Sequence, residues 1–286
     1  MFVIDLRFGL IFPYDYDYEH EHVHEKFSMA GGDRTPHEEL WQAEKARRMA
    51  TGKGVEVRML VIGERINTSR KAMAPAVAAR DAAFIQAEAR SQVEAGANLV
   101  DVNCGTFVEE EPELLAWLVE TVQAAVEAPL CLDSPNPVAL KNALPLHKGR
   151  AMINSITAEK ERWEKVLPLV LEYNARVIAL TMDDRGMPET AEERLKVAAW
   201  LIENLVKHGV KEDDIFIDPL VRPVSTGSHY ATVVYETIRR VKEEFPGVHT
   251  VCGLSNVSFG LPARKLINQA FLIQTMAAGL DTVILD

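Results

Sequence analysis

From Met59 onward the chain alternates between short apolar runs and longer segments in which apolar residues recur with helical spacing. Continuous apolar runs bounded by polar turns are typical of parallel strands that are buried on both faces. The predicted strands are Met59–Ile62, Leu99–Val102, Leu130–Leu132, Ala151–Ile153, Val177–Leu180, Ile215–Ile217, Thr250–Gly253 and Thr282–Leu285. The predicted helices are Arg80–Ala95, Pro112–Val126, Val138–Leu144, Trp163–Tyr173, Glu192–His208, Tyr230–Phe245 and Leu266–Ala278.

Eight strands separated by helices favour an α/β fold in which the sheet closes into a (β/α)₈ TIM barrel. An open doubly wound sheet is the alternative, but its first strand would be followed by a G-x-G-x-x-G turn, and Gly63–Asn67 reads GERIN. The last predicted strand ends just before Asp286, so the eighth outer helix has no counterpart in this sequence. We expect a fragment of a longer barrel; an N-terminal helix around Leu40–Met49 or a partner subunit could instead cover the gap.

Residues 1–58 differ in composition from the rest, because they hold four of the eight His and three of the six Tyr. We interpret residues 1–58 as an appendage with at most one helix, from about Pro36 to Ala50, and residues 59–286 as the barrel domain. The alternative is that the natural start is Met59 and that the upstream stretch is not native.

Composition places few limits on function but excludes some classes. The chain has 286 residues, a formal net charge of −11, 48% hydrophobic and 26% charged residues, which are ordinary globular values. The acidic balance and the lack of a Lys/Arg cluster argue against a nucleic-acid partner. No apolar run is long enough to span a membrane and the N-terminus has no basic region before an apolar segment, so we expect neither a membrane span nor a signal peptide. The expected location is the cytoplasm.

Isolated cysteine and histidine residues have simple interpretations. Cys104, Cys131 and Cys252 lie far apart in apolar surroundings, which indicates reduced thiols that pack in the core rather than disulfides. The alternating histidines at 20, 22 and 24 could share one face of an extended strand and bind a transition metal. Because glutamates are interleaved with them, a solvated tail is the favoured interpretation.

Carboxylate and carboxamide side chains follow nearly every predicted strand, where the functional loops of a barrel begin. No His stands at a strand end, and there is no G-x-S-x-G elbow and no Walker loop, so a zinc site, a serine hydrolase and a nucleotide-phosphate site are not expected. Asp and Asn offer acceptors and donors that suit a neutral heterocycle such as a pterin or a purine. The strand-end residues are Glu64, Asn67, Asp101, Asn103, Asp133, Ser134, Asn154, Ser155, Asp183, Asp184, Asp218, Ser255, Asn256 and Asp286.

The alternative for each strand-end residue is that it caps the following helix. Asp133 and Asp218 are the strongest candidates for ligand binding, because each directly follows a buried apolar strand. Asp183 and Asp184 are the weakest, because Arg185-Gly186 after them makes a simple loop sufficient.

Seven motifs in sequence order carry a specific resemblance: GERIN (Gly63–Asn67), DVNCG (Asp101–Gly105), CLDS (Cys131–Ser134), AMINS (Ala151–Ser155), LTM (Leu180–Met182), IDPL (Ile217–Leu220) and GLSNVSFGLPARKLIN (Gly253–Asn268). Together they resemble the methyltetrahydrofolate:corrinoid protein methyltransferases, and SNVSF is also similar to the folate module of cobalamin-dependent methionine synthase. The resemblance covers residues 59–286 and implies a dihydropteroate-synthase-like TIM barrel, in agreement with the periodicity.

The resemblance implies roles for the residues that match the family's motifs. Asp133, Asn154 and Asp218 would hold the pterin ring by hydrogen bonds. Asn256 would act in catalysis, since it matches the residue that approaches N5, the nitrogen that bears the methyl group. Arg264 would lie near the p-aminobenzoyl-glutamate tail, where its guanidinium could pair with a carboxylate.

Further positions of the motifs would line the same pocket. The resemblance places Glu64, Asp101 and Asn103 around the ring with less specific roles. Gly253 and Ser255 would shape the loop beside it.

The implied reaction moves a methyl group between N5 of methyltetrahydrofolate and the cobalt of a corrinoid, in a direction that the sequence leaves open. A tertiary amine is a poor leaving group, so a hydrogen bond from Asn256 that strengthens in the transition state is the expected catalytic contribution. No D-x-H-x-x-G-type cobalamin motif occurs, so a partner would carry the corrinoid: a corrinoid iron–sulfur protein or a small corrinoid-binding protein. No metal site is expected in the barrel, and a homodimer is implied by the resemblance alone.

The sequence leaves two rival functions open. A dihydropteroate synthase must bind a diphosphate and carries a Ser-Arg-Lys type pattern in its late loop, where this chain has Ser255–Ser258 (SNVS). A non-catalytic or truncated pterin-binding module is the other alternative.

Overall fold

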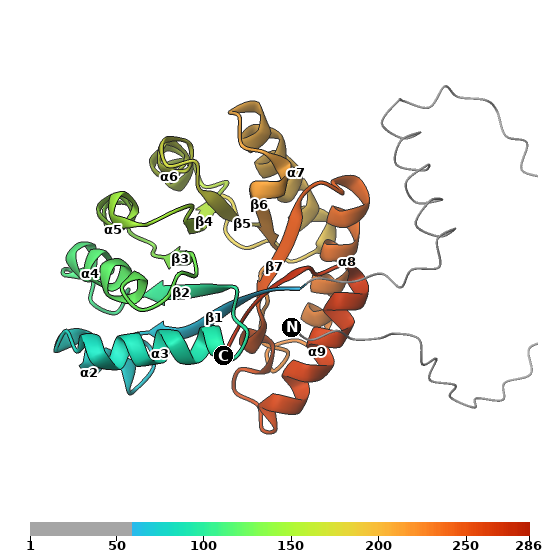
Figure 1. The fold of residues 1–286 in the computed structure, drawn as a ribbon. Helices are drawn as coiled ribbons and strands as arrows, with labels where there is room; N and C mark the ends of the chain where they lie inside the picture. The colour runs from blue at the N-terminus through green and yellow to red at the C-terminus, as the bar shows by residue number, and fades with distance from the viewer. Residues whose placement is uncertain (1–58) are drawn as a thin grey trace, which may run out of the picture. The chain divides into compact units, whose positions relative to one another are not determined.

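A computed structural model of the protein describes residues 59–286, and its eight parallel strands form a closed barrel (Figure 1). Each strand pairs with the next one along the chain, and the last strand pairs with the first. The predicted closed barrel is therefore confirmed over the open sheet. The strands are β1 (Leu60–Asn67), β2 (Leu99–Asn103), β3 (Leu130–Asp133), β4 (Met152–Thr157), β5 (Arg176–Leu180), β6 (Ile215–Asp218), β7 (His249–Gly253) and β8 (Thr282–Leu285).

Helices surround the barrel and connect consecutive strands (Figure 1). All seven predicted helices are present, while α2 and three short 3₁₀ turns were not predicted. The helices are α2 (Met73–Ala78), α3 (Ala82–Glu94), α4 (Glu111–Gln123), α5 (Pro137–Ala143), α6 (Lys160–Glu172), α7 (Ala191–Lys207), α8 (His229–Glu244) and α9 (Arg264–Ala278), and the 3₁₀ turns are η1 (Leu144–Leu146), η2 (Glu212–Asp214) and η3 (Leu254–Ser258). The predicted appendage of residues 1–58, its helix and its histidines lie outside the described residues.

Two strands continue several residues beyond the end that the apolar pattern predicts. β1 continues from Ile62 through the GERIN motif to Asn67, with a bulge between Gly63 and Ile66. β4 likewise continues past Asn154, with a bulge between Asn154 and Ile156. A bulge inserts an extra residue and re-aims the side chains next to it, so polar residues that look like loop residues are parts of strands.

Helix capping is performed by residues other than the strand-end candidates. Asp81 accepts a hydrogen bond from the Phe84 N–H at the start of α3, and Asn136 does the same for Val138 at the start of α5. Thr190 and Glu193 form a reciprocal capping box on α7. No strand-end candidate is the N-cap residue of a described helix or caps the helix that follows it, although Asp184 accepts the N–H of Lys160 at the start of the preceding helix, α6.

The interior of the barrel is filled by one apolar layer to which every strand contributes one residue. We call this layer the plug: Ile62, Leu99, Cys131, Met152, Ile178, Phe216, Val251 and Ile284. All eight side chains are buried. Such a layer makes the barrel a packed core rather than a pore.

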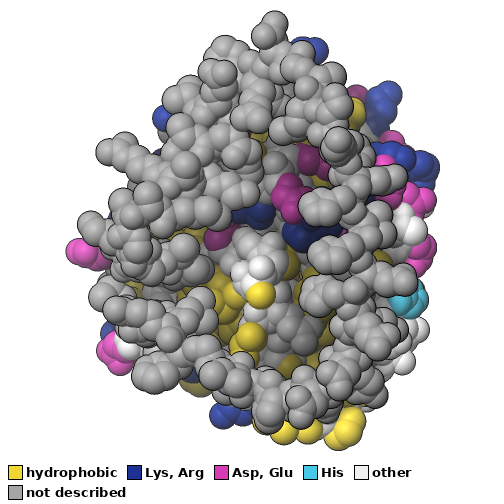
Figure 2. Space-filling model, turned by 90° about the vertical axis from the view of Figure 1, so that its right-hand side faces the viewer, with side chains coloured by type: hydrophobic (Ala, Val, Ile, Leu, Met, Phe, Trp, Pro, Cys, Tyr) yellow, Lys and Arg dark blue, Asp and Glu magenta, His cyan; other side chains and the backbone are white. Residues whose placement is uncertain are grey.

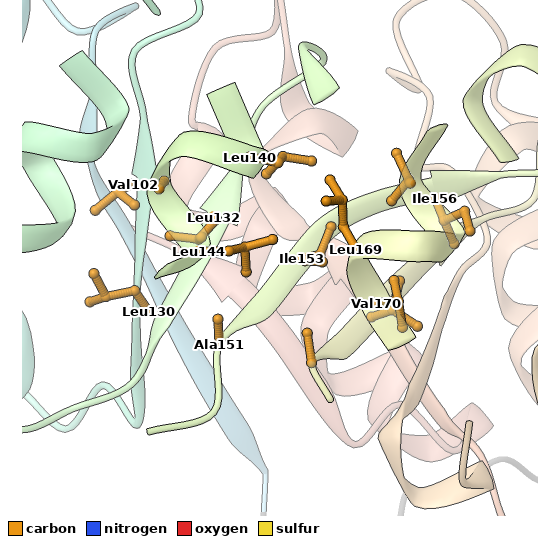
Figure 3. Packing of buried hydrophobic residues seen from close by; sticks show 14 of the residues in the cluster. Val102, Leu130, Leu132, Leu140, Leu144, Ala151, Ile153, Ile156, Leu169 and Val170 are labelled. Carbon is orange, nitrogen blue, oxygen red and sulfur yellow. The ribbon is translucent and has the colours of Figure 1, made fainter. Parts of the chain in front are cut away.

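A second apolar layer lies between the strands and the outer helices. Figure 3 shows part of it, where Leu132 of β3 and Ile153 of β4 pack against Leu140 of α5 and Leu144 of η1. Alternate residues of each strand therefore serve the plug and the helix layer, which explains the continuous apolar runs in the sequence.

The outer surface carries charges of both signs. On the face shown in Figure 2, Lys and Arg side chains lie beside Asp and Glu side chains. On α8, Arg239 pairs with Glu243 at 2.8 Å and Arg240 with Glu192 of α7 at 2.6 Å. No helix between residues 59 and 286 is long and apolar enough to cross a membrane.

A charged cluster lies at the amino-terminal end of the strands, on the far side of the plug from the strand-end residues. The His249 ring stacks on Phe216 of the plug with centroids 4.7 Å apart. Its Nδ1 lies 3.0 Å from Asp281 and its Nε2 3.1 Å from Asp213. The hydrogen bond to Asp281, with the charge of that carboxylate, raises the pKa of His249 even though burial opposes the shift.

We expect the contribution of His249 to stability to fall as pH rises. A raised pKa in the folded protein means that the contribution is complete below the unfolded value, about 6.5, and is lost as pH rises through the folded value. His249→Gln should therefore lower the free energy of unfolding by about 1–2 kcal/mol near pH 6 and by less near pH 9. Urea unfolding at both pH values measures this, with His208→Gln as control; an equal loss at both would contradict the assignment.

Candidate active site

A ring of polar residues lies directly above the plug, at the carboxyl ends of the strands. Successive residues of a strand face opposite sides, so the residue two positions after each plug residue faces the barrel interior again. In most strands that residue is a carboxylate or a carboxamide that the sequence had singled out. The ring consists of Glu64, Asp101, Asp133, Asn154, Leu180, Asp218, Gly253 and Asp286. The structure thus brings together residues from distant parts of the chain.

Hydrogen bonds within the ring pair acids with polar neighbours. Asn103 at the end of β2 donates from Nδ2 to Asp133 Oδ2 at 2.7 Å, while its Oδ1 accepts the Gly105 N–H at 3.0 Å. Ser255 of η3 donates to Glu64 Oε1 at 3.1 Å across the β1–β7 side of the mouth. Asn103 and Ser255 therefore orient acidic side chains of the ring.

Four carboxyl groups of the ring, those of Glu64, Asp101, Asp133 and Asp218, are less acidic than ordinary ones because they are buried. Burial raises the pKa of Glu64 and Asp133, and it raises the pKa of Asp218 to about 6. Asp101 is 2% exposed, and burial, followed by the nearby charge of Asp133, raises its pKa well above the ordinary value. One Asp101 oxygen, Oδ1, has no hydrogen-bond partner among the described residues.

The loop after β3 and β4 is held from outside by residues that the sequence did not reveal. Ser134 donates to Glu111 Oε1 at 2.6 Å, and Glu111 is buried at the start of α4. Arg162 of α6 donates to the carbonyl oxygens of Ser134 at 2.9 Å and of Ser155 at 2.8 Å. Both residues belong to charged stretches that look solvent-exposed in the sequence, so no local signal distinguishes them.

Asp218 ends β6 in a tight turn. Its Oδ1 accepts the N–H of Leu220 at 2.7 Å, and Leu220 has a left-handed backbone with φ of 63°. The backbone N–H and the hydroxyl of Thr181 both donate to the Asp218 carbonyl at 3.0 Å. Arg194 of α7 donates to the carbonyls of Pro219 and Leu220 at 2.5 and 2.9 Å. The carboxyl group is thus fixed in its direction by the backbone on both sides.

Asn256 lies on η3 at the rim of the mouth and is exposed. A Cβ atom on Gly253 would lie 3.2 Å from Asn256 Nδ2, so the glycine leaves room for the carboxamide. Arg264 donates to the Ser255 carbonyl at 2.8 Å and to Ser258 Oγ at 3.0 Å. Its guanidinium therefore anchors η3, and its pairing with a folate tail stays a prediction.

The residues ranked lowest by sequence lie outside the ring. Asp183 accepts from Arg185 within a short turn at 2.7 Å, and Asp184 accepts the Lys160 N–H at 3.2 Å. Asp183 therefore stabilises its own turn, and Asp184 the amino-terminal end of α6.

The cysteines are buried free thiols, as predicted. Burial raises the pKa of Cys104 to about 12 and raises the pKa of Cys131 and Cys252 well above the ordinary value. Within residues 59–286, no group of three or more His, Cys, Asp or Glu side chains is arranged to hold a metal ion.

Residues 63–286 match the family model of pterin binding enzymes. The chain belongs to the pterin binding enzyme family. It is 39% identical over 230 residues to the methylcorrinoid:tetrahydrofolate methyltransferase of Eubacterium limosum, a match that covers 80% of this chain and 85% of that protein. It is 35% identical over 240 residues to the methionine synthase of Mycobacterium tuberculosis, of which it spans 20%. The predicted resemblance to methyltransferases, and with it membership of that enzyme class, is confirmed.

Solved structures with the same fold include dihydropteroate synthases. The Xanthomonas albilineans enzyme with 4-aminobenzoic acid has a TM-score of 0.60 at 20% identity, over 79% of this chain and 86% of that one. The Thermus thermophilus enzyme has a TM-score of 0.55 at 19% identity, over 79% and 87%. At these identities the likeness shows the fold alone, and it confirms the predicted dihydropteroate-synthase-like barrel.

We expect Asp101→Asn to stabilise the protein at alkaline pH. The unfolded chain releases the Asp101 proton near pH 4 whereas the folded protein retains it to higher pH, so ionisation favours unfolding as pH rises between the two values. Asparagine removes this penalty, and the variant should gain about 1–3 kcal/mol over the wild type near pH 8, and less near pH 4. Thermal unfolding at both pH values measures the gain.

The matched control is Asp81→Asn, which replaces one good helix cap by another and should show no pH-dependent difference. A loss of stability in Asp101→Asn near pH 8 would contradict the assigned burial cost.

Proposed function

We propose that this protein transfers a methyl group between N5 of methyltetrahydrofolate and the cobalt of a corrinoid that a partner protein carries. The observation that carries the proposal is the polar ring above the plug, in a chain that is 39% identical to a methylcorrinoid:tetrahydrofolate methyltransferase. The name of that relative favours the direction from the corrinoid to tetrahydrofolate. The partner would be a corrinoid iron–sulfur protein or a small corrinoid-binding protein, and the predicted homodimer remains a prediction.

The ring suits a pterin because a pterin presents adjacent N–H donors and acceptors on one edge and carries no charge. Asp133 and Asp218 would accept hydrogen bonds from the N–H groups of the pterin and of its amino substituent, and Asn154 would both donate and accept. Glu64 and Asp101 face the same space, and burial raises the pKa of both carboxyl groups. An uncharged pterin would add no further charge to this group of acids.

Asn256 would act at N5. In the direction from methyltetrahydrofolate, the methyl carbon passes to a cob(I) centre that supplies the electron pair of the new Co–C bond, and the C–N bond breaks with its own pair left on nitrogen. A hydrogen bond from Asn256 Nδ2 or a proton on N5 would stabilise that pair. In the reverse direction N5 attacks the methyl carbon, the C–Co bond breaks with its pair going to cobalt, and N5 releases its proton. A carboxamide has both a donor and an acceptor, so it can serve either direction.

The partner would approach over the mouth of the barrel. Val108 after β2 and Phe259 after η3 are apolar side chains that remain 70% and 66% exposed on the loops of this end. Contiguous exposed apolar patches mark protein interaction sites, and we propose that Val108 and Phe259 belong to the surface that contacts the partner. They would let the corrinoid of the partner reach the methyl group.

Asn256→Ala tests the catalytic assignment. We expect kcat/KM for methyl transfer from methyltetrahydrofolate to free cob(I)alamin to fall by about 10²–10³, because the variant loses a hydrogen bond that strengthens in the transition state. The transfer is followed optically through the cobalamin spectrum, with free cobalamin used so that the partner is not needed.

The matched control is Asn204→Ala on α7, whose carboxamide donates to the Trp200 carbonyl of the same helix at 2.8 Å and which should retain full activity. A loss of less than about threefold in Asn256→Ala, with the fold intact, would exclude the role at N5.

A further inference from the structure

Arg194 is a buried cation with no carboxylate partner. It lies in the first turn of α7 and is 0% exposed, yet no described carboxylate forms an ion pair with it. Its guanidinium donates instead to three backbone carbonyls, those of Pro188 at 3.1 Å, Pro219 at 2.5 Å and Leu220 at 2.9 Å. Removing an unpaired charge from water costs free energy, so packing alone does not explain a buried guanidinium at this position.

Two of the three carbonyls belong to the turn that fixes Asp218. The turn is held by the guanidinium through its carbonyls and by the Asp218 carboxylate through the Leu220 N–H at 2.7 Å. The left-handed backbone of Leu220, which is uncommon for a residue other than glycine, allows both contacts at once. Loss of the guanidinium would therefore free the turn that aims the Asp218 side chain.

The charge of Arg194 also acts on Asp218, which is 8% exposed. Burial raises the pKa of Asp218, and two contacts oppose that rise: first the hydrogen bond from the Leu220 N–H, which belongs to the turn that Arg194 holds, and then the positive charge of Arg194 itself. The other charged groups near Arg194 are Glu189 and Arg222, which pair with each other at 2.6 Å and largely cancel. The neighbouring Cys252 thiol has a raised pKa and carries no charge. Among the described residues, Arg194 is the cation whose charge lowers the pKa of Asp218.

Arg162 repeats the arrangement one helix earlier. It lies in the first turn of α6 and donates to the carbonyls of Ser134 and Ser155, the residues that follow Asp133 and Asn154. A guanidinium from an outer helix therefore supports the backbone next to Asp133 and next to Asp218, the two strongest candidates from the sequence.

We propose that Arg194 is a positioning residue for Asp218: it holds the Asp218–Leu220 turn through its carbonyls and keeps the carboxylate charged, and therefore able to accept hydrogen bonds from a ligand with paired N–H donors. The inference rests on the proposed function only in naming that ligand as a pterin. The contacts between Arg194 and the Asp218–Leu220 turn are present in the protein without ligand.

Two variants of the full chain separate charge from geometry. Arg194→Gln removes the charge but keeps an N–H donor, whereas Arg194→Lys keeps the charge without the forked geometry. The first measurement is the titration of the Asp218 carboxyl by ¹³C NMR in the free protein, with the signal assigned through Asp218→Asn. We expect the Asp218 pKa to rise by about one pH unit in Arg194→Gln and to stay near its wild-type value in Arg194→Lys.

The second measurement is the affinity for methyltetrahydrofolate as a function of pH. In Arg194→Gln the loss of affinity should be about fivefold greater near pH 6 than near pH 8, because the raised pKa leaves far less of the carboxyl charged at the lower pH. In Arg194→Lys the loss should be similar at both pH values, since only the geometry has changed. The control is Arg150→Gln, which removes a guanidinium that pairs with Asp214 at 2.8 Å at the other end of the barrel and should alter neither curve.

An unchanged Asp218 titration in Arg194→Gln would overturn the inference. If Arg194→Gln does not fold, an Asp218 pKa in Arg194→Lys that rises by about one pH unit would overturn it as well, because the retained charge should hold it. Wild-type protein that binds no methyltetrahydrofolate would instead overturn the proposed function, while the titration in the free protein would still decide the role of Arg194.

Discussion

The closure of eight parallel strands determines which side chains of this protein can reach a ligand. Every strand must place alternate residues inside the barrel, and at one level all eight of these are apolar and form the plug. The next inward position of each strand then lies at the mouth, above an apolar floor and close to its counterparts on neighbouring strands. Polar residues at that level are therefore gathered into one site regardless of their distance in the sequence.

The chemistry of the site follows from the same floor. Carboxyl groups that rest on a dry apolar layer lose hydration, and those of Glu64, Asp101, Asp133 and Asp218 all have raised pKa values for which burial is the largest cause. Burial therefore disfavours the charged form of these four carboxyl groups relative to an exposed carboxyl group. Together with the amides of the ring they offer hydrogen-bond acceptors and donors, which suits an uncharged pterin.

Much of this arrangement could be predicted from the sequence, for reasons that are specific to certain residues. Asp133 and Asp218 stand directly after apolar runs, so the sequence predicts both the strands that carry them and their position at the mouth of the barrel. The ends of β1 and β4 were not, because bulges continue the strands through polar motifs that look like turns. Arg162, Arg194 and Glu111 were missed because charged residues in the first turn of a helix usually face water, and only the tertiary structure shows that these reach backbone carbonyls or a serine hydroxyl beneath the loops.

The polar ring above the plug is proposed as a pterin site, and a crystal structure of the full chain with methyltetrahydrofolate would show whether a pterin binds there. We expect the pterin ring inside the mouth, with Asp133, Asn154 and Asp218 in hydrogen-bond contact with its edge and Asn256 next to N5. A pterin bound elsewhere on the protein, or held in the mouth without contacts to these side chains, would be incompatible with the proposed site.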